Sequence, residues 1–164
     1  MNAMLRTVVL ALSAWVLAGC LSSQAPRVDY TTLTGQVLKP ADYQGEVMVV
    51  NFWATSCTTC VKEMPALIDT HNKYKAQGLR TIAVAMSYDR PDYVMNFAQT
   101  RNLPFDVALD IDGKIAKSFD DVRITPTTFL IDRKGAIVKT YVGEPDFAAL
   151  HALIEKSLAS PRPI

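Results

Sequence analysis

The sequence predicts an α/β fold, in which helices flank a central mixed sheet. Two segments, 46–53 and 79–86, are almost continuously apolar, as strands buried on both faces of a sheet are. Segments with helical spacing of apolar residues separate the strand patterns, and this alternation is typical of α/β domains. The last two strand patterns, 127–131 and 136–142, are joined by a short turn, which predicts a terminal hairpin. The roughly 130 residues after the N-terminal region suit one domain.

The remaining elements follow in chain order from turn residues and apolar spacing. The helix after the first central strand begins at Cys57 and ends before Gly78, because glycine readily adopts the conformation that follows helix ends. Pro91 suits the first turn of the next helix. The expected elements are a small hairpin at 30–38, strands at 46–53 and 79–86, helices at 57–77 and 91–101, a strand at 105–109, a helix at 115–119, strands at 127–131 and 136–142, and a helix at 145–158.

Residues 1–19 have the features of a secretory signal peptide. A positive charge at Arg6 precedes an apolar stretch, 8–19, that ends in small residues. This stretch is shorter than the roughly 20 residues that span a bilayer. The run Leu17-Ala18-Gly19-Cys20 resembles the bacterial lipobox, which implies that Cys20 is lipidated and becomes the mature N-terminus. An ordinary cleaved signal and an uncleaved anchor are the alternatives.

Residues 20–29 lack periodicity and are expected to form a flexible, lipid-anchored tether to a domain at 30–160. By the lipoprotein sorting pattern, Leu21 after the cysteine favours the outer membrane over the inner membrane. The signal predicts a periplasmic location, where disulfides persist and thiols must be kept reduced.

The charge of the chain gives no sign of a nucleic-acid partner. The full chain has 17 Lys and Arg against 16 Asp and Glu, and removal of residues 1–19 takes away Arg6, which leaves equal numbers. No basic stripe occurs along the sequence, so nucleic acid is excluded as an expected partner.

Cys57 and Cys60 lie two residues apart where a strand pattern meets a helix pattern. The first turn of a helix favours a thiolate, which makes the first cysteine a better nucleophile and leaving group. The chain has three cysteines, too few for a second pair and hence for a four-thiolate zinc site. His71 and His151 are too far apart in sequence for a zinc module. No metal or other cofactor is therefore expected; two buried structural cysteines are the alternative to a redox pair.

The chain resembles the thioredoxin fold and, within it, the TlpA/ResA/CcmG group of membrane-tethered bacterial thiol-disulfide oxidoreductases. The likeness covers about residues 30–158, and the segment 91–109 matches the central insert of that group. The residues that carry the likeness are Val50-Asn51-Phe52-Trp53-Ala54-Thr55-Ser56-Cys57-Thr58-Thr59-Cys60-Val61-Lys62-Glu63-Met64-Pro65, then Thr125-Pro126-Thr127-Thr128-Phe129-Leu130-Ile131-Asp132 and Gly135.

Helix geometry assigns different roles to the two cysteines. Cys57, at the helix start, is expected to be the exposed nucleophile, and Cys60 the buried thiol that resolves the mixed disulfide. In the group that the chain resembles, a glutamate at the position of Glu63 tunes the protonation of the cysteines. The alternative for Glu63 is a first-turn acid favoured by the helix dipole. Thioredoxin uses a strand aspartate for this duty, and Asn51, which cannot titrate, stands there in this chain.

The resemblance also assigns residues that contact the substrate. It implies a cis peptide bond before Pro126, although most X–Pro bonds are trans. A cis bond would leave the backbone of Thr125 free to pair with a bound peptide. Trp53 is expected either as a wall of the active site that contacts substrate or as a core residue.

Three residues depart from the pattern of the group and leave the direction of electron flow open. Ser56 stands where the group usually has Trp, and Thr58-Thr59 stands where Gly-Pro or Glu-Pro is common. The dipeptide and the pKa of the thiol help to set the reduction potential.

The resulting hypothesis is a monomeric, lipid-anchored thiol-disulfide oxidoreductase that reduces protein disulfides, with no cofactor. Similar proteins receive electrons from a membrane transporter of the CcdA/DsbD type, and many act on apocytochromes in cytochrome c maturation. The alternatives are a peroxiredoxin-like thiol peroxidase and a copper chaperone of the Sco type.

Overall fold

The computed structural model describes residues 23–163 and shows one five-stranded mixed sheet with the order β5-β4-β3-β6-β7. Strand β3 is central, parallel to β4 and antiparallel to β6. The elements are β1 (Tyr30–Thr31), β2 (Val37–Leu38), α1 (Pro40–Tyr43), β3 (Val47–Trp53), α2 (Thr58–Tyr74), the 3-10 helix η1 (Lys75–Gln77), β4 (Leu79–Ala85), α3 (Pro91–Thr100), β5 (Asp106–Leu109), α4 (Lys114–Ser118), β6 (Thr127–Ile131), β7 (Ile137–Val142) and α5 (Phe147–Leu158). The predicted α/β class, central mixed sheet and N-terminal hairpin are confirmed.

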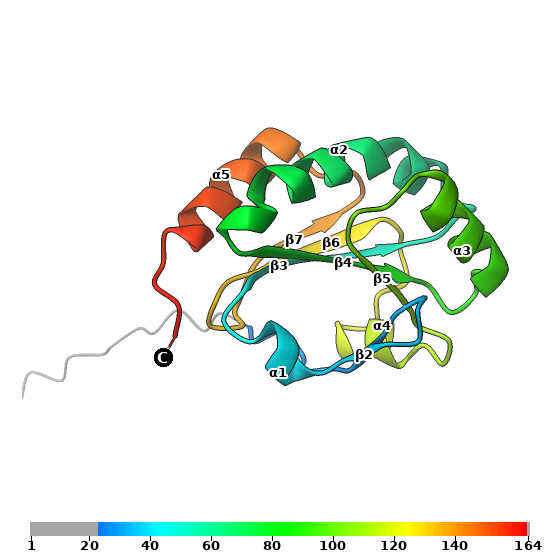
Figure 1. Ribbon diagram of the computed structural model, residues 1–164, viewed down its shortest axis with the longest axis horizontal. Helices are drawn as coiled ribbons and strands as arrows, with labels where there is room; N and C mark the ends of the chain where they lie inside the picture. Colours follow the sequence, from blue (N-terminus) through cyan, green and yellow to red (C-terminus); the bar gives the residue numbers. More distant parts are fainter. Residues whose placement is uncertain (1–22, 164) are drawn as a thin grey trace, which may run out of the picture.

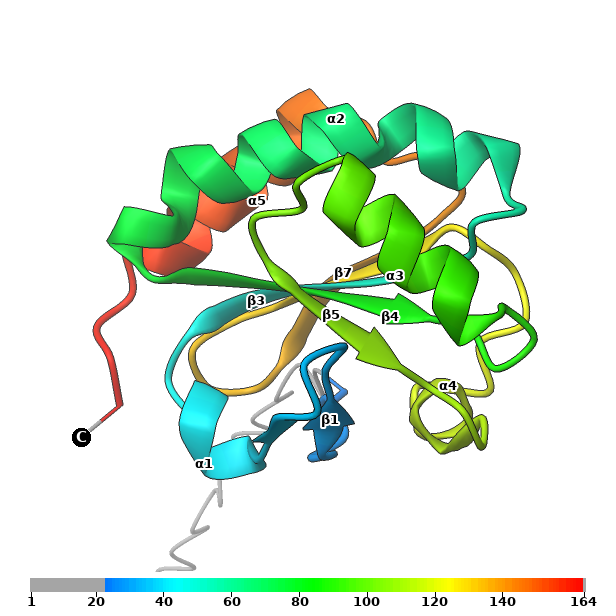
Figure 2. The ribbon, with the colours of Figure 1, turned by 45° about the vertical axis from the view of Figure 1, so that its right-hand side comes forward.

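Helices α2, α3 and α5 cover one face of the sheet, while α1, α4 and the β1–β2 hairpin lie on the other (Figures 1 and 2). Strands β3 and β4 are buried on both faces, which explains why they are almost wholly apolar in sequence. The hairpin is held at the sheet edge by the Leu33 N–H, which donates to the Val107 carbonyl of β5 at 3.0 Å.

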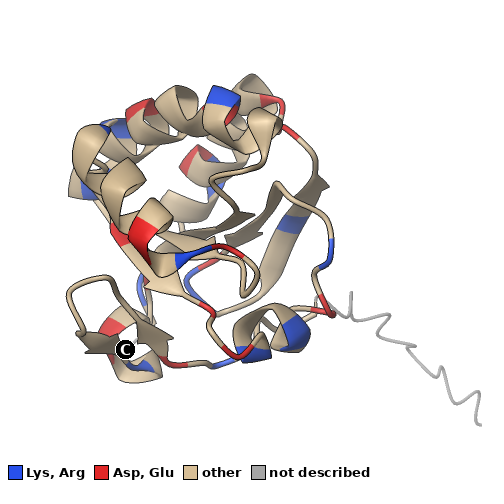
Figure 3. Cartoon of the chain, turned by 90° about the vertical axis from the view of Figure 1, so that its right-hand side faces the viewer, with Lys and Arg blue, Asp and Glu red and all other residues tan. Residues whose placement is uncertain are grey.

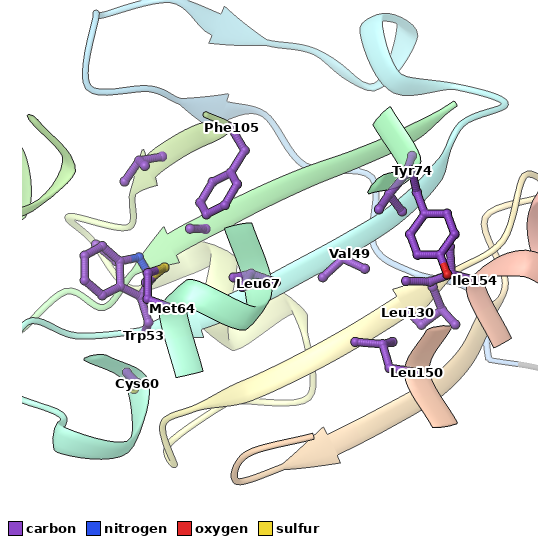
Figure 4. Close-up of a cluster of buried hydrophobic side chains, with 14 of the residues drawn as sticks. Val49, Trp53, Cys60, Met64, Leu67, Tyr74, Phe105, Leu130, Leu150 and Ile154 are labelled. Carbon is purple, nitrogen blue, oxygen red and sulfur yellow. The ribbon is translucent and has the colours of Figure 1, made fainter. Parts of the chain in front are cut away.

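Helix α2 is held against the sheet by residues spaced three or four apart along one side. Cys60, Met64, Leu67 and Tyr74 are all buried there, and Figure 4 shows them packed over the strands with Leu130 and Leu150. Because this stripe begins at Cys60, packing of the whole helix fixes the second cysteine in the core.

At the end of the sheet opposite the start of α2, a buried arginine connects three segments of the chain. Arg133 donates to the carbonyl of Gly45 at 3.0 Å, and less closely to those of Gln77 and Leu158. The last two carbonyls end η1 and α5, so their partial negative charge offsets the charge of the guanidinium. Arg133 therefore ties two helix ends to the turn before β3.

Two parts of the N-terminal region differ from the sequence prediction. No helix was expected between residues 38 and 46, but Pro40–Tyr43 form the short helix α1. Residues 23–29, expected within a flexible tether, lie along the domain: Ile137 donates to the Ser23 carbonyl and Ala25 donates to the Gly135 carbonyl, both at 2.8 Å. The ordered domain therefore begins before Tyr30. The predicted signal peptide, Cys20 and the lipobox lie outside the described residues.

Candidate functional site

Cys57 and Cys60 lie at the carboxyl end of β3, where the chain turns into α2. Cys57 is the N-cap of α2, and its Sγ accepts a hydrogen bond from the Cys60 backbone N–H at 3.1 Å. The two cysteines are joined by a disulfide. Cys57 is half-buried, whereas Cys60 is fully buried, so only the first sulfur is open to a partner. This arrangement agrees with the predicted nucleophile and resolving thiol.

The loop that contains Pro126 lies beside this redox pair because β6 is the neighbour of β3. Phe52 of β3 pairs with Thr127 of β6, which brings the residue after Pro126 to the end of β3. The Thr125–Pro126 peptide bond is cis, as the resemblance implied. The Pro126 carbonyl accepts from the Gly143 N–H at 2.8 Å, which ties this loop to the end of β7.

Glu63 is a buried carboxyl on α2, three residues after Cys60 and thus on the same side of the helix. Its Oε1 accepts a hydrogen bond from Asn51 Nδ2 at 3.0 Å, and the same amide donates to Thr128 Oγ1 at 2.9 Å. Its other oxygen, Oε2, has no hydrogen-bond partner among the described residues. Two strands and a helix therefore meet at one buried acid.

Burial raises the pKa of Glu63 from 4.5 to about 7. The hydrogen bond from Asn51 lowers this pKa, while the negative charge of Glu144 raises it. A carboxyl with a pKa near neutrality exchanges its proton readily at physiological pH, as a general acid and base must. The alternative of a solvated first-turn acid does not fit, because Glu63 is only 2% exposed.

Trp53 is fully buried and cannot contact a substrate with its side chain, which corrects its assignment as a substrate-binding residue. Its ring packs against Phe97 of α3, with 5.0 Å between the ring centroids. Of the two sequence alternatives, the core residue is therefore the one that the structure shows.

The two histidines are far from the cysteines. His71 packs against Phe105 and is buried rather than at the surface, and His151 shares a hydrogen bond with Thr70 Oγ1 at 2.8 Å. Thr70 lies ten residues after Cys60 on α2, which is roughly 15 Å along that helix. His151 of α5, which contacts Thr70, is therefore far from the cysteines. Within residues 23–163, no group of three or more His, Cys, Asp and Glu is arranged to hold a metal ion.

Sequence reasoning missed two contacts that shape the site. Asn51 was noted only as a residue that cannot titrate, yet it is the partner of Glu63. A polar residue inside an apolar strand was the available signal, because buried amides need hydrogen-bond partners. Thr55, two residues before Cys57, donates through its N–H and hydroxyl to the Asp89 carboxylate, and no sequence pattern indicated that pairing.

A helix that starts with a redox disulfide, a neighbouring cis-proline loop and a buried acid behind the pair define a thioredoxin-fold thiol-disulfide oxidoreductase. A model of the Redoxin family matches residues 21–154, and the chain belongs to that family. It is 34% identical over 137 residues to the thiol-disulfide oxidoreductase ResA of Bacillus thuringiensis subsp. konkukian, which covers 83% of this chain and 78% of that protein.

Two solved structures agree with this assignment. One is the solution structure of a protein assigned as a thioredoxin from Neisseria meningitidis, with 40% identity and a TM-score of 0.76, covering 82% of this chain and 90% of that one. The other is assigned as the thiol:disulfide interchange protein DsbE from Chlorobium tepidum, with 32% identity and a TM-score of 0.77, covering 84% and 97%. The chain is thus a thiol-disulfide oxidoreductase whose pair is Cys57 and Cys60.

The raised pKa of Glu63 predicts that the oxidised protein loses stability as the pH rises from 4.5 to about 7. In that window the folded state retains a proton on Glu63 that the unfolded state has released, so stability is greatest below the window. At roughly 1.4 kcal/mol per pH unit, the loss from this group is at most about 3.5 kcal/mol. Urea unfolding of the oxidised protein on both sides of the window measures it.

Glu63→Gln is the matched control, because the amide keeps the shape of the protonated acid but does not titrate. The variant should lack this part of the pH dependence. An unfolding free energy that changes equally with pH in parent and variant would show that Glu63 is ionised normally in the folded protein.

Proposed function

We propose that the chain is an extracytoplasmic, lipid-anchored reductase of protein disulfides. The observation that carries the proposal is the division of the pair: Cys57 is accessible, while Cys60 is buried on the same helical side as the acid Glu63. This geometry suits two successive sulfur exchanges with a polypeptide too large to enter a pocket.

In the first step, the Cys57 thiolate attacks one sulfur of the partner's disulfide. A bond forms between the Cys57 sulfur and the attacked sulfur, the partner's own S–S bond breaks, and the second partner sulfur leaves as a thiolate and takes up a proton. Thr125 precedes the cis bond to Pro126, in the loop that leads into β6 beside the end of β3, and its backbone is the proposed contact for the partner chain.

In the second step, Cys60 resolves the mixed disulfide. Its thiol gives its proton to Glu63, whose Oε2 has no competing donor among the described residues. The Cys60 sulfur then attacks the Cys57 sulfur, the partner's first sulfur leaves, and the Cys57–Cys60 disulfide forms. Two electrons have passed from the dithiol to the partner.

The surroundings of Cys57 favour the reducing direction. A strongly oxidising pair requires a reduced form that is stabilised as a thiolate. Here the residues between the cysteines, Thr58 and Thr59, are uncharged, and the nearby cation Lys62 is held by Glu144 at 2.9 Å. The start of α2 and the Cys60 backbone N–H stabilise the thiolate, but Thr58, Thr59 and the paired Lys62 add no free positive charge to that stabilisation.

The proposed anchor at Cys20 would hold the opposite end of the domain near the membrane. Ser23 docks at the turn between β6 and β7, far from the start of α2. Ser23 is three residue steps along the chain from Cys20, a reach of at most about 10 Å. The disulfide would then face away from the membrane. Among residues 23–163, no helix is long and apolar enough to cross a bilayer.

The proposed partners follow from this location. Electrons would come from a membrane transporter of the CcdA/DsbD type, and apocytochrome cysteines are proposed substrates. The leaflet is proposed to be that of the outer membrane. Figure 3 shows Lys and Arg positions scattered among Asp and Glu positions along the chain, and nucleic acid is not a proposed partner.

The reduction potential tests the proposed direction. We expect a value close to that of thioredoxin, about −270 mV, in redox equilibration of the purified domain against glutathione or dithiothreitol buffers. A value near the strongly oxidising end, about −120 mV, would make the chain an oxidant and overturn the reductase assignment.

Trapping tests the nucleophile and names the substrates. Cys60→Ala removes the resolving thiol, so envelope proteins should accumulate as mixed disulfides on Cys57 and be identified by mass spectrometry. Cys57→Ala is the matched control and should trap far less, because Cys60 is buried. Equal trapping by both variants, or none by Cys60→Ala, would refute the assigned roles.

A further inference from the structure

A groove lies directly beside the redox pair, between the turn that precedes α2 and helix α3. Its volume is about 460 Å³, and Ser56, the residue before Cys57, is part of its wall. The groove is on the side of Cys57 away from the Pro126 loop, because β4, which leads into α3, and β6 flank β3 on opposite sides. The lining residues are Thr55, Ser56, Tyr93, Asn96, Phe97, Thr100 and Arg101.

The walls of this groove are held in place by the core and by hydrogen bonds. Asp89 accepts from the Thr55 N–H at 2.5 Å and from its hydroxyl at 2.7 Å, which fixes the redox turn to the start of α3. Phe97 rests on the buried ring of Trp53, and Val94 is fully buried under the helix. The groove is therefore formed before any partner arrives, which lowers the cost of binding.

The groove combines aromatic surface with one unpaired positive charge. Tyr93 is 54% exposed, and the guanidinium of Arg101 lies over the Phe97 ring, 5.6 Å from its centroid. Among the described residues, no carboxylate lies within salt-bridge distance of Arg101, whereas Arg90 pairs with Asp92 at 2.7 Å. Asp89, which precedes α3, is engaged by Thr55 of the redox turn.

We propose that this groove binds the segment of the partner polypeptide next to its reactive cysteine, and selects an aromatic or large apolar residue accompanied by an acidic one. The inference rests on the proposed reduction of protein disulfides. A partner sulfur that reaches Cys57 must bring its flanking residues over Ser56, so the groove is continuous with the redox site. Tyr93 and Phe97 supply the apolar contact, and Arg101 the charge.

Two synthetic peptides test the selection, each carrying one cysteine in a mixed disulfide with thionitrobenzoate. One has tyrosine and aspartate near the cysteine, and the other has serine and lysine at those positions. Reduced protein attacks the peptide sulfur through Cys57, thionitrobenzoate leaves with the bonding electrons and is measured by its absorbance, and Cys60 then releases the peptide as a thiol. A small disulfide without a peptide reports the reactivity of Cys57 alone.

The wild-type protein should prefer the acidic aromatic peptide, and Arg101→Glu should lower kcat/KM for it by about tenfold. Arg101→Gln should lower this kcat/KM by a smaller factor. Tyr93→Ala should lower kcat/KM for the acidic aromatic peptide and reduce the preference for it over the serine–lysine peptide. Lys139→Glu is the matched control: it reverses an exposed charge on β7, at the other edge of the sheet. Lys139→Glu should react with the small disulfide as the wild type does, and the kcat/KM of each groove variant for a peptide is divided by its value for the small disulfide.

The outcomes separate the groove from the proposed function. If the wild type reduces both peptides with equal kcat/KM, the groove does not select the partner. The same follows if Arg101→Glu changes kcat/KM for the peptides no more than Lys139→Glu does. If Arg101→Glu instead abolishes a self-association of the wild type, the occupant is a second copy and the proposal is wrong. If reduced wild type attacks neither peptide nor the small disulfide, it is the reductase function that fails.

Discussion

The hydrogen bond from Asn51 to Glu63 is the contact on which the site depends, because it sets a buried acid behind the disulfide. It requires two independent parts of the fold to agree. Antiparallel pairing places Asn51 opposite Thr128, so that the amide is held between the strands and points one N–H at α2. The packing of α2 turns Glu63 inward together with Cys60. The result is a buried carboxyl whose Oε1 accepts a hydrogen bond, while its Oε2 has no hydrogen-bond partner among the described residues.

The packing of α2 against the sheet also explains the unequal exposure of the two sulfurs. The stripe of α2 that carries Met64 and Leu67 into the core also buries Cys60, while Cys57, at the helix start, remains accessible. The sheet order then provides a loop on each side of Cys57, with Pro126 on one side and the turn to α3 on the other. In the proposed mechanism, proton transfer thus involves buried groups, exchange with the partner's sulfur takes place at the accessible Cys57, and recognition falls to the loops at one end of the sheet.

Much of this arrangement could be predicted from local sequence. Continuous apolar runs identified the central strands, and the position of Cys57 at a strand-to-helix junction identified the redox pair, because both signals are confined to a few adjacent residues. The cis bond before Pro126 came from the family resemblance, since composition alone favours trans.

Contacts between distant segments could not be predicted in the same way. The partnership of Asn51 and Glu63, and that of Thr55 and Asp89, depends on strand register and on how helices pack, which no single segment encodes. The docking of Ser23 on the β6–β7 turn is a backbone pairing that leaves no pattern in side chains. Trp53 was ambiguous because an aromatic residue at the end of a strand suits a core as well as a site wall.

The most direct test of the central claim is a titration of the Glu63 side-chain carboxyl carbon by NMR in the oxidised, carbon-13-labelled protein. We expect a midpoint at about pH 7. Replacement of Asn51 by Ala should move the midpoint to a higher pH, because the hydrogen bond from Asn51 lowers the pKa of Glu63. A midpoint near the ordinary value of 4.5 would contradict the central claim, since Glu63 would then be ionised at neutral pH and unable to hold or pass a proton as proposed.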